Sequence, residues 1–321
     1  MALRIGFLGA GGIARTHLNA LSQLEEAQVV ALCDIVEERA VNAAKQFNAL
    51  AFTDHRKMLD EVKMDALFVC LPPFAHTDGE IIAAEKGIHI LVEKPVALTM
   101  DKAEEIDEAI SKAGVISSVA YHWRYAETTK RAMELLEGKE IAALHGYWLG
   151  GMPKVEWWRV KEKSGGQMVE QTTHIFDLAR YFVGDAQSVY ALGFKGILEK
   201  EVENHNVEDA SVALIRFKNG LIGQISSTDV ITQGGLTGLH IFCAGLTLQI
   251  TPSLLTIREE GKVTEMRQRH DCYFVEDSTF LEAIKSGDAS KILSPYSDAV
   301  KTLSLTLGAN KSLETGEVVA L

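Results

Sequence analysis

The sequence predicts an α/β fold class in two parts, a doubly wound parallel sheet at the N-terminus and a C-terminal α+β domain with a large, mostly antiparallel open sheet. Short apolar runs alternate with helical segments up to residue 120, and longer runs of alternating apolar and polar residues follow. At 321 residues the chain also exceeds the size at which a single hydrophobic core usually stops growing. These observations predict two domains, residues 1–120 and residues 121–321.

The N-terminal part repeats strand–helix units. Such units connect parallel strands through right-handed crossovers and bury both faces of the sheet under helices. Strands are expected at Leu3–Leu8, Val29–Cys33, Ala66–Cys70, His89–Val92 and Val115–Ala120, and helices at Ile13–Gln23, Val36–Phe47, Asp78–Lys86 and Met100–Ala113.

The C-terminal part has the alternation that is typical of antiparallel strands. Asn219-Gly220 separates two of its runs and predicts a two-residue hairpin, because both positions accept positive φ. Helices are expected to cover one face of this sheet, and the uncovered face predicts a homodimer or homotetramer interface. The runs are Leu144–Leu149, Ser188–Phe194, Ala210–Phe217 and Leu221–Thr228, and the helices are Gln167–Val183, Glu276–Ser286 and Ser297–Leu307.

Composition and charge exclude several classes of partner. A net charge of −12 would repel a phosphate backbone, so no nucleic-acid partner is expected. No apolar stretch has the length of a bilayer span, so no membrane association is expected. The 4 cysteines lie scattered along the chain, which predicts neither a disulfide framework nor a zinc ribbon and agrees with a cytoplasmic location. A small polar ligand is the expected partner.

A glycine-rich turn, Gly9-Ala10-Gly11-Gly12-Ile13-Ala14, joins the first expected strand to the first helix. It has the Gly-x-Gly-x-x-Ala form of the Rossmann dinucleotide-binding fingerprint, although glycine turns also occur here for packing alone. Gly9 permits the tight turn, Gly11 lets backbone amides approach a pyrophosphate, and Ala14 lets the helix lie close to the sheet. The helix N-terminus stabilises the phosphate charge. The candidate cofactor contacts are Gly9, Gly11, Gly12 and Ile13.

Asp34 strengthens this interpretation. It ends the second expected strand, where a carboxylate accepts hydrogen bonds from the hydroxyls of the adenosine ribose. The same charge would repel a 2′-phosphate. The sequence therefore predicts NAD as the cofactor, with NADP less favoured.

Further motifs follow the later strands. Leu71-Pro72-Pro73 with His76, and Glu93-Lys94-Pro95, each follow an expected strand, and Tyr121-His122-Trp123-Arg124-Tyr125 begins the second part. Trp158-Arg159 precedes Gly165-Gly166. With these motifs the whole chain resembles the Gfo/Idh/MocA oxidoreductase family, which includes inositol and glucose dehydrogenases and glucose-fructose oxidoreductase.

The resemblance implies roles for the residues of these motifs. In the family, the lysine of Glu-Lys-Pro contacts the reacting hydroxyl and the nicotinamide region, which assigns this role to Lys94. The bond between Lys94 and Pro95 is often cis in the family. The further candidate cofactor contacts are Leu71, Pro72, His76 and Glu93.

The family also places a carboxylate four residues before a histidine on a helix, and Glu170 and His174 stand at that spacing here. This chain departs from the pattern, because the usual aspartate is Glu170 and the usual glycine is Thr172. Glu170, His174 and Asp177 would share one helix face. We expect His174 to act as the general base, Lys94 to stabilise the developing alkoxide, and Glu170 to orient the substrate or His174.

The remaining candidates have two interpretations each. Tyr121 and Arg124 either contact the substrate or anchor the contact between domains, and Trp158 either stacks on a sugar ring or packs in the core. Asp177 either contacts the substrate or pairs with Arg180 along the helix. No metal is expected, because Glu170 and His174 have no evident third ligand.

The function favoured by the sequence is an NAD-dependent oxidoreductase that transfers a hydride between nicotinamide and a secondary hydroxyl carbon of a sugar, glycoside or cyclic polyol. One alternative is a glycosidase that uses NAD for transient oxidation followed by elimination. The other is a sensor of sugars or dinucleotides without catalytic activity. Lys94 and His174 favour an enzyme over a sensor.

Overall fold

A computed structural model describes residues 2–321 of the chain, and these form two compact units. The first unit runs to His122 and also includes Asp271–Val300. The second unit comprises Trp123–His270 and Lys301–Leu321. The boundary expected near residue 120 lies beside the end of the first segment, whereas the return of Asp271–Val300 to the first unit was not expected.

The first unit holds a parallel sheet of six strands in the order β3-β2-β1-β4-β5-β6. All of its strand pairs are parallel. The strands are β1 (Leu3–Leu8), β2 (Ala27–Cys33), β3 (Leu50–Phe52), β4 (Ala66–Val69), β5 (His89–Val92) and β6 (Ser117–Val119). The helices are α1 (Gly12–Leu21), α2 (Glu37–Phe47), α3 (His55–Glu61), η1 (Pro73–Ala75), α4 (Gly79–Glu85), α5 (Met100–Ala113) and α10 (Cys272–Ser286).

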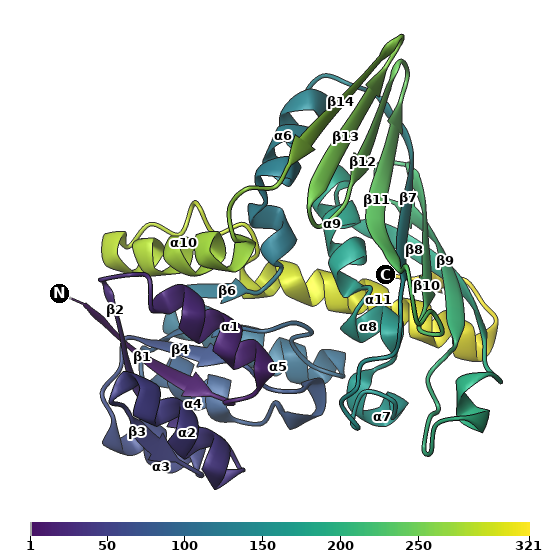
Figure 1. Cartoon of the computed structure of the whole chain (residues 1–321). Helices are drawn as coiled ribbons and strands as arrows, with labels where there is room; N and C mark the ends of the chain where they lie inside the picture. The colour runs from purple at the N-terminus through teal and green to yellow at the C-terminus, as the bar shows by residue number, and fades with distance from the viewer. Residues whose placement is uncertain (1) are drawn as a thin grey trace. The chain divides into compact units, whose positions relative to one another are not determined.

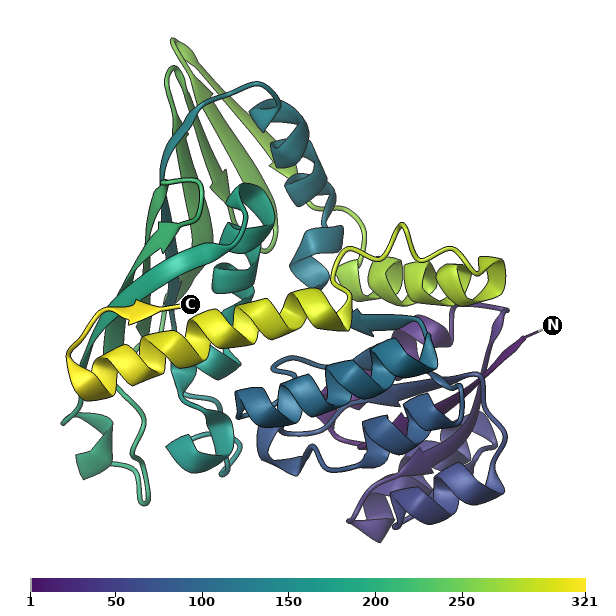
Figure 2. The ribbon, with the colours of Figure 1, turned by 180° about the vertical axis from the view of Figure 1, so that it is seen from behind.

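Helices cover both faces of this sheet, with α1 and α10 on one side and α4 and α5 on the other (Figures 1 and 2). Strand β4 is buried at every position, as expected for a strand with helices on both faces. Phe280 and Leu281 of α10 join Ile5, Phe7 and Phe68 in one core. The expectation that Glu276–Ser286 covers the second sheet is therefore wrong, because an apolar helix face does not specify which sheet will bury it.

The strand order brings four loops to one edge of the sheet. β1 lies between β2 and β4, and β5 follows β4, so the strand order reverses between β1 and β4. In open sheets of this kind, ligands bind beyond the carboxyl ends of the strands at such a reversal. The glycine turn follows β1, Asp34 follows β2, and the loops from Leu71 and from Glu93 follow β4 and β5.

The second unit holds a sheet of nine strands in the order β14-β13-β12-β11-β7-β10-β9-β8-β15. Most pairs are antiparallel, but β7 and β10 pair in parallel, which corrects the expectation that these two runs are antiparallel. The strands are β7 (Ile141–Leu149), β8 (Ala186–Phe194), β9 (Ala210–Phe217), β10 (Ile222–Thr228), β11 (Leu236–Cys243), β12 (Leu246–Ile250), β13 (Leu254–Glu259), β14 (Lys262–Arg267) and β15 (Val319–Ala320).

Helices lie on one face of this second sheet (Figure 1). α6, α9 and α11 contribute to its core together with the inward residues of the strands. The helical segments are η2 (His122–Tyr125), α6 (Glu127–Leu136), α7 (Lys161–Ser164), α8 (Gln167–Glu170), α9 (Thr173–Val183), η3 (Leu198–Lys200) and α11 (Tyr296–Thr315), the first residues of η2 and α11 being grouped with the first unit.

The helix expected at Gln167–Val183 is interrupted. α8 ends at Glu170 and α9 begins at Thr173. Between them, the buried Thr172 hydroxyl lies 2.8 Å from the Ser227 hydroxyl of β10. A threonine held by a neighbouring strand in this way is compatible with a helix break, whereas apolar periodicity alone predicted one continuous helix.

The opposite face of the second sheet carries an apolar patch over β8, β9 and the start of β10. Leu192 is 60% exposed, Leu214 is 52% exposed, and Ile222 is 53% exposed. Val212 belongs to the same patch, since it pairs with Leu192 across the two strands. Among the described residues, no helix combines the length and apolar character that a bilayer span requires.

Candidate functional site

The glycine turn after β1 has the backbone shape that the sequence predicted. Gly9 has φ +94°, a conformation that residues with a Cβ rarely adopt. A Cβ at Gly9 would lie 2.3 Å from the carbonyl oxygen of Cys70, at the end of β4. Glycine at this position therefore serves the close approach of two strand ends, independently of any ligand.

Gly11 and Gly12 face a different environment. A Cβ built at either position meets no atom within 4 Å. Helix α1 starts here with no side-chain cap and no acidic residue in its first turn. Its first amides and the positive end of its dipole therefore suit an anionic group, and the open space above the two glycines suits a pyrophosphate. Ile13, the next residue of the first turn, is half-buried.

Asp34 is held beside the glycine turn by two backbone amides. The amide of Ala10 donates to Oδ2 at 2.9 Å, and the amide of Val36 donates to Oδ1 at 2.9 Å. The side chain remains half-buried, so its oxygens keep lone pairs toward solvent. Ile35 follows it and is 92% exposed.

Lys94 lies where β5 ends. The backbone amide of Lys94 donates to Oε2 of Glu93 at 3.0 Å, and the bond between Lys94 and Pro95 is cis. The Glu93 side chain is buried, whereas Lys94 is half-buried. The Glu93 carboxylate therefore holds the backbone amide of Lys94 in place.

Two residues that sequence reasoning missed hold Glu93 in place. Nε2 of His17, on α1, lies 3.2 Å from Oε1 of Glu93, and Nδ1 of His17 lies 2.9 Å from Oδ1 of Asp277, on α10. All three side chains are buried. The signal in the sequence was a histidine on the apolar face of α1, but its partner on α10 is distant in the chain.

In this buried group, His17 and Glu93 each favour the charged form of the other. Burial alone would lower the pKa of His17, but Asp277 and Glu93 outweigh it and raise that pKa well above 6.5. Burial alone would raise the pKa of Glu93, but its hydrogen bond and ion pair with His17 outweigh it and lower that pKa. The group therefore holds an imidazolium against a Glu93 carboxylate.

His76 forms a separate buried pair. Its Nδ1 contacts Oε1 of Glu80 one helical turn later, and both side chains are buried. Burial favours the neutral form of Glu80, but the charge of His76 and its hydrogen bond outweigh this effect and lower the pKa of Glu80. The structure thus places this candidate cofactor contact inside a pair that also supports the loop after β4.

The other candidates of the first unit lie at neighbouring strand ends. Leu71 and Pro72 are half-buried in the loop after β4, and a Cβ at Gly9 would lie 3.4 Å from Leu71. Tyr121 follows β6 and is buried, with its amide donating to the carbonyl of Val119 at 2.7 Å.

In the second unit, His174 lies in an aromatic setting at the start of α9. The ring centroids of Trp123 and Trp148 lie 6.4 Å and 6.0 Å from that of His174, with interplanar angles of 17° and 20°. The His174 side chain is buried. The two nearly parallel indoles restrict the plane of the imidazole, and the sequence assigned neither tryptophan a role in the site.

Glu170 ends α8 and is oriented by a tryptophan. The indole Nε1 of Trp158 donates to Oε2 of Glu170 at 2.7 Å, and Trp158 has no exposed surface. Trp158 therefore packs in the core of the second unit and holds the carboxylate, which favours the packing interpretation over stacking on a sugar ring.

Asp177 and Arg124 pair with one another. Arg124 donates from Nε to Oδ2 at 2.7 Å and from Nη2 to Oδ1 at 2.5 Å, and both residues are buried. The hydroxyl of Thr302 also donates to Oδ1 of Asp177 at 2.9 Å. Arg180, the expected alternative partner of Asp177, pairs with Asp185 at 2.6 Å, and its charge also favours the ionised form of Asp177. This bidentate pair occupies the side chain of Asp177 with structural contacts.

Models of known protein families match both units. Residues 3–121 match the model described as "Oxidoreductase family, NAD-binding Rossmann fold". Residues 130–249 match the model described as "GFO/IDH/MocA C-terminal domain". Together the two matches span more than half of the chain.

Individual relatives match over nearly the full length. The chain is 26% identical to myo-inositol 2-dehydrogenase of Thermotoga maritima, with 99% of this chain and 98% of the relative covered. It is 26% identical to D-glucoside 3-dehydrogenase of Escherichia coli, with 88% and 86% covered. The fold matches that of the WlbA dehydrogenase from Bordetella pertussis, solved with NADH and UDP-GlcNAcA, at a TM-score of 0.85, 23% identity and coverage of 100% and 99%.

Proposed function

Because the chain belongs to the GFO/IDH/MocA family of NAD-binding oxidoreductases, we propose that it transfers a hydride between nicotinamide and a secondary hydroxyl carbon of a sugar, glycoside or cyclic polyol. The observation that carries the proposal is Lys94 at the carboxyl end of β5. Its backbone amide donates to the buried Glu93, which in turn contacts the buried His17. The names of the relatives, an inositol dehydrogenase and a glucoside dehydrogenase, support the substrate class.

The first unit fits NAD. The uncapped start of α1 and the open space above Gly11 and Gly12 suit the pyrophosphate, and Asp34 suits the ribose hydroxyls. When bound, NAD accepts the hydride that leaves the hydroxyl carbon. The negative charge of Asp34 supports NAD over NADP, since a 2′-phosphate would meet a carboxylate there.

Oxidation of a hydroxyl carbon also requires loss of the hydroxyl proton. We propose that His174 accepts this proton, because an imidazole accepts protons near neutral pH and two indoles fix its plane. Lys94 would place a positive charge beside the developing alkoxide. Glu170, held by Trp158, would orient the hydroxyl or the imidazole.

We assign no substrate contact to Asp177 or Arg124, because each is the other's partner. Their bidentate contact is buried and includes Thr302, so its contribution is to stabilise the start of the second unit. Tyr121 keeps its assignment as a candidate substrate contact, because it follows β6 at the same sheet edge as the loops after β1, β4 and β5.

We also propose that a second copy of the chain covers the apolar patch of Leu192, Val212, Leu214 and Ile222. A patch of this kind on one face of a sheet whose other face is already buried is typical of an interface between subunits. Light scattering of the wild type should give a dimer or tetramer mass, and Leu214→Glu should lower it. A monomeric wild type would overturn the proposal.

The function is tested by incubating the protein with NAD and a panel of aldoses, glycosides and inositols while following the absorbance of reduced nicotinamide. At least one substrate should give a linear increase, and Lys94→Ala and His174→Asn should each lower kcat by about 100-fold or more, as expected for a group acting in the transition state. Lys86→Ala is the matched lysine control, because its ammonium pairs with Asp60 on the surface.

Two outcomes would overturn the proposal. Release of an aglycone from a glycoside without net reduction of NAD would indicate a glycosidase. Tight binding of a sugar without turnover, unchanged in Lys94→Ala and His174→Asn, would indicate a sensor.

A further inference from the structure

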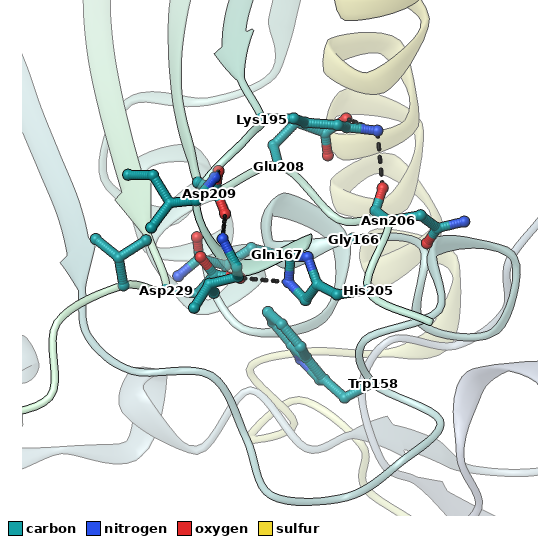
Figure 3. A network of polar contacts seen from close by, with 12 residues as sticks. Trp158, Gly166, Gln167, Lys195, His205, Asn206, Glu208, Asp209 and Asp229 are labelled. Carbon is teal, nitrogen blue, oxygen red and sulfur yellow. Dashed lines mark hydrogen bonds and ion pairs between the residues drawn. The ribbon is translucent and has the colours of Figure 1, made fainter. Parts of the chain in front are cut away.

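Three chemically reactive side chains converge at one end of the β9–β10 hairpin in the second unit. Asp209 directly precedes β9 and Asp229 directly follows β10, and the two strands pair so that Thr228 lies opposite Ala210. His205 lies in the preceding connection. Its ring and the two carboxylates offer three ligand atoms within 4.8 Å of one another, and all three residues are buried (Figure 3).

Asp229 is incompletely satisfied in this cluster. Its Oδ2 lies 3.4 Å from Nε2 of His205, a long contact, and its Oδ1 is buried with no hydrogen-bond partner. Leaving a buried polar atom without a partner costs about 1–3 kcal/mol. A protonated Asp229 that donates to His205 through Oδ2 would still leave Oδ1 without a donor. Among the described residues, one buried carboxylate oxygen of Asp229 is therefore left without a donor.

The charge around Asp229 also lacks a balancing cation. The buried carboxylates of Asp209 and Asp229 offer oxygens that lie within 4.8 Å of one another. The nearby ammonium groups of Lys161 and Lys195 pair with Glu208 at 2.7 Å and 3.2 Å. Within residues 2–321, neither Asp209 nor Asp229 forms an ion pair with a lysine or arginine. A bound cation would supply this missing charge.

Asp209 is oriented as metal ligands commonly are. The amides of Ile197 and Leu198 donate to its Oδ2 and Oδ1 at 2.7 Å and 3.0 Å. Such outer contacts fix a carboxylate while leaving each oxygen a second lone pair for an ion. The connection that carries His205 is also anchored, because the Asn206 amide donates to the carbonyl of Arg159 at 3.0 Å.

We propose that His205, Asp209 and Asp229 bind one divalent transition-metal ion, with Zn²⁺ the best match. One imidazole nitrogen and two carboxylate oxygens are ligands that Zn²⁺ accepts, with water in a fourth position. Bonds of about 2.0–2.2 Å put the ligand atoms of a tetrahedral site about 3.4 Å apart. His205 Nε2 and Asp229 Oδ2 already lie 3.4 Å apart, and every other separation is within 4.8 Å, so binding would shorten these by at most about 1.4 Å. The ion joins the ends of β9 and β10 to the connection that precedes them.

None of the three ligands is among the residues assigned to the hydride chemistry above. All three come from the hairpin ends and the preceding connection rather than from α8 or α9, so the ion is expected to link these segments, with water in its open position. The spacing of the three residues along the chain did not predict a site, so this proposal departs from the expectation that no metal is bound.

The test uses the full chain after treatment with EDTA and dialysis. Titration calorimetry with Zn²⁺ should give one site per chain, and thermal melting should show that Zn²⁺ raises Tm. Asp229→Asn and His205→Gln should each weaken binding by at least about 100-fold, since loss of even an outer contact to a metal ligand weakens binding 10–100-fold. His145→Gln, at an exposed histidine of the same sheet, is the matched control and should bind as the wild type does.

A second measurement tests the site in the wild type, without any variant. Anomalous diffraction at the zinc edge from crystals of the wild type grown with Zn²⁺ should give one strong peak among His205, Asp209 and Asp229. The absence of that peak, or Zn²⁺ binding that Asp229→Asn and His205→Gln leave unchanged, would overturn the proposal.

Discussion

Replacement of Gly11 by alanine separates cofactor binding from folding. The backbone of Gly11 is extended, at φ −79° and ψ −162°, and a Cβ there meets no atom within 4 Å. Alanine is therefore compatible with the fold and should stabilise it by about 0.4–1 kcal/mol, because it restricts the unfolded chain. In the proposed complex, the same Cβ would occupy the space of the pyrophosphate.

The expected loss of affinity follows from the contacts at the start of α1. A hydrogen bond from an amide to a charged group contributes about 1.5–3 kcal/mol. Loss of one such bond weakens binding by about 10- to 150-fold, since each 1.4 kcal/mol corresponds to a factor of ten. We therefore expect Gly11→Ala to keep or slightly raise Tm while its Kd for NAD increases by that factor.

Gly9→Ala is the matched comparison. Its φ of +94° and the approach of a Cβ to 2.3 Å from the Cys70 carbonyl predict backbone strain and overpacking. Together these cost about 2–6 kcal/mol of unfolding free energy. Calorimetric titration with NAD and thermal melting of both variants distinguish the two effects. Wild-type affinity for NAD in Gly11→Ala would refute the reasoning, as would a fall in its Tm as large as that of Gly9→Ala.

Three further predictions test other contacts. Asp34→Ala should weaken NAD binding by about tenfold and bring the Kd values for NAD and NADP closer together, and an unchanged ratio of the two would remove Asp34 from the ribose site. His17 titrates with a pKa raised above its usual value of 6.5, so its stabilising contribution is complete below pH 6.5 and is lost as pH rises through the raised pKa. Urea unfolding of wild type and His17→Gln at pH 6, 7.5 and 9 should show their difference shrinking by up to about 1.4 kcal/mol per pH unit, and a constant difference would contradict the charged state of His17. Arg124→Met should cost about 3–5 kcal/mol because it removes the bidentate partner of the buried Asp177 carboxylate, and the double variant Arg124→Met with Asp177→Leu should recover most of that loss in the same unfolding assay.

Local signals made much of the first unit predictable. The helix at Met100–Ala113 has the expected bounds, because the hydroxyl of Thr99 caps its start and Gly114 ends it with φ +66°. The strands β1 and β5 also have the expected bounds. Each of these elements is specified by residues adjacent in the chain, so a single sequence contains the information.

Contacts between distant segments were not predictable in the same way. His17 meets Asp277 across 260 residues, and Arg124 meets Asp177 across 53. The choice of partner depends on how α10 and α9 pack, which periodicity does not contain. The strands β11–β14 were also missed. Their two-residue loops, Ala244-Gly245 and Glu260-Gly261, each carry a glycine at positive φ, but the first residue of each loop lacks the preference for positive φ that made Asn219-Gly220 a strong signal.

The most direct test of the central claim follows the fate of the substrate hydrogen. A sugar or inositol identified as a substrate is supplied with deuterium on its hydroxyl-bearing carbons, and the reduced nicotinamide is analysed by mass spectrometry. Direct transfer predicts one deuterium per nicotinamide formed and none in the solvent from that step. Reduced nicotinamide without the label, or label released to water, would contradict the proposal that this chain transfers a hydride from the hydroxyl carbon to NAD.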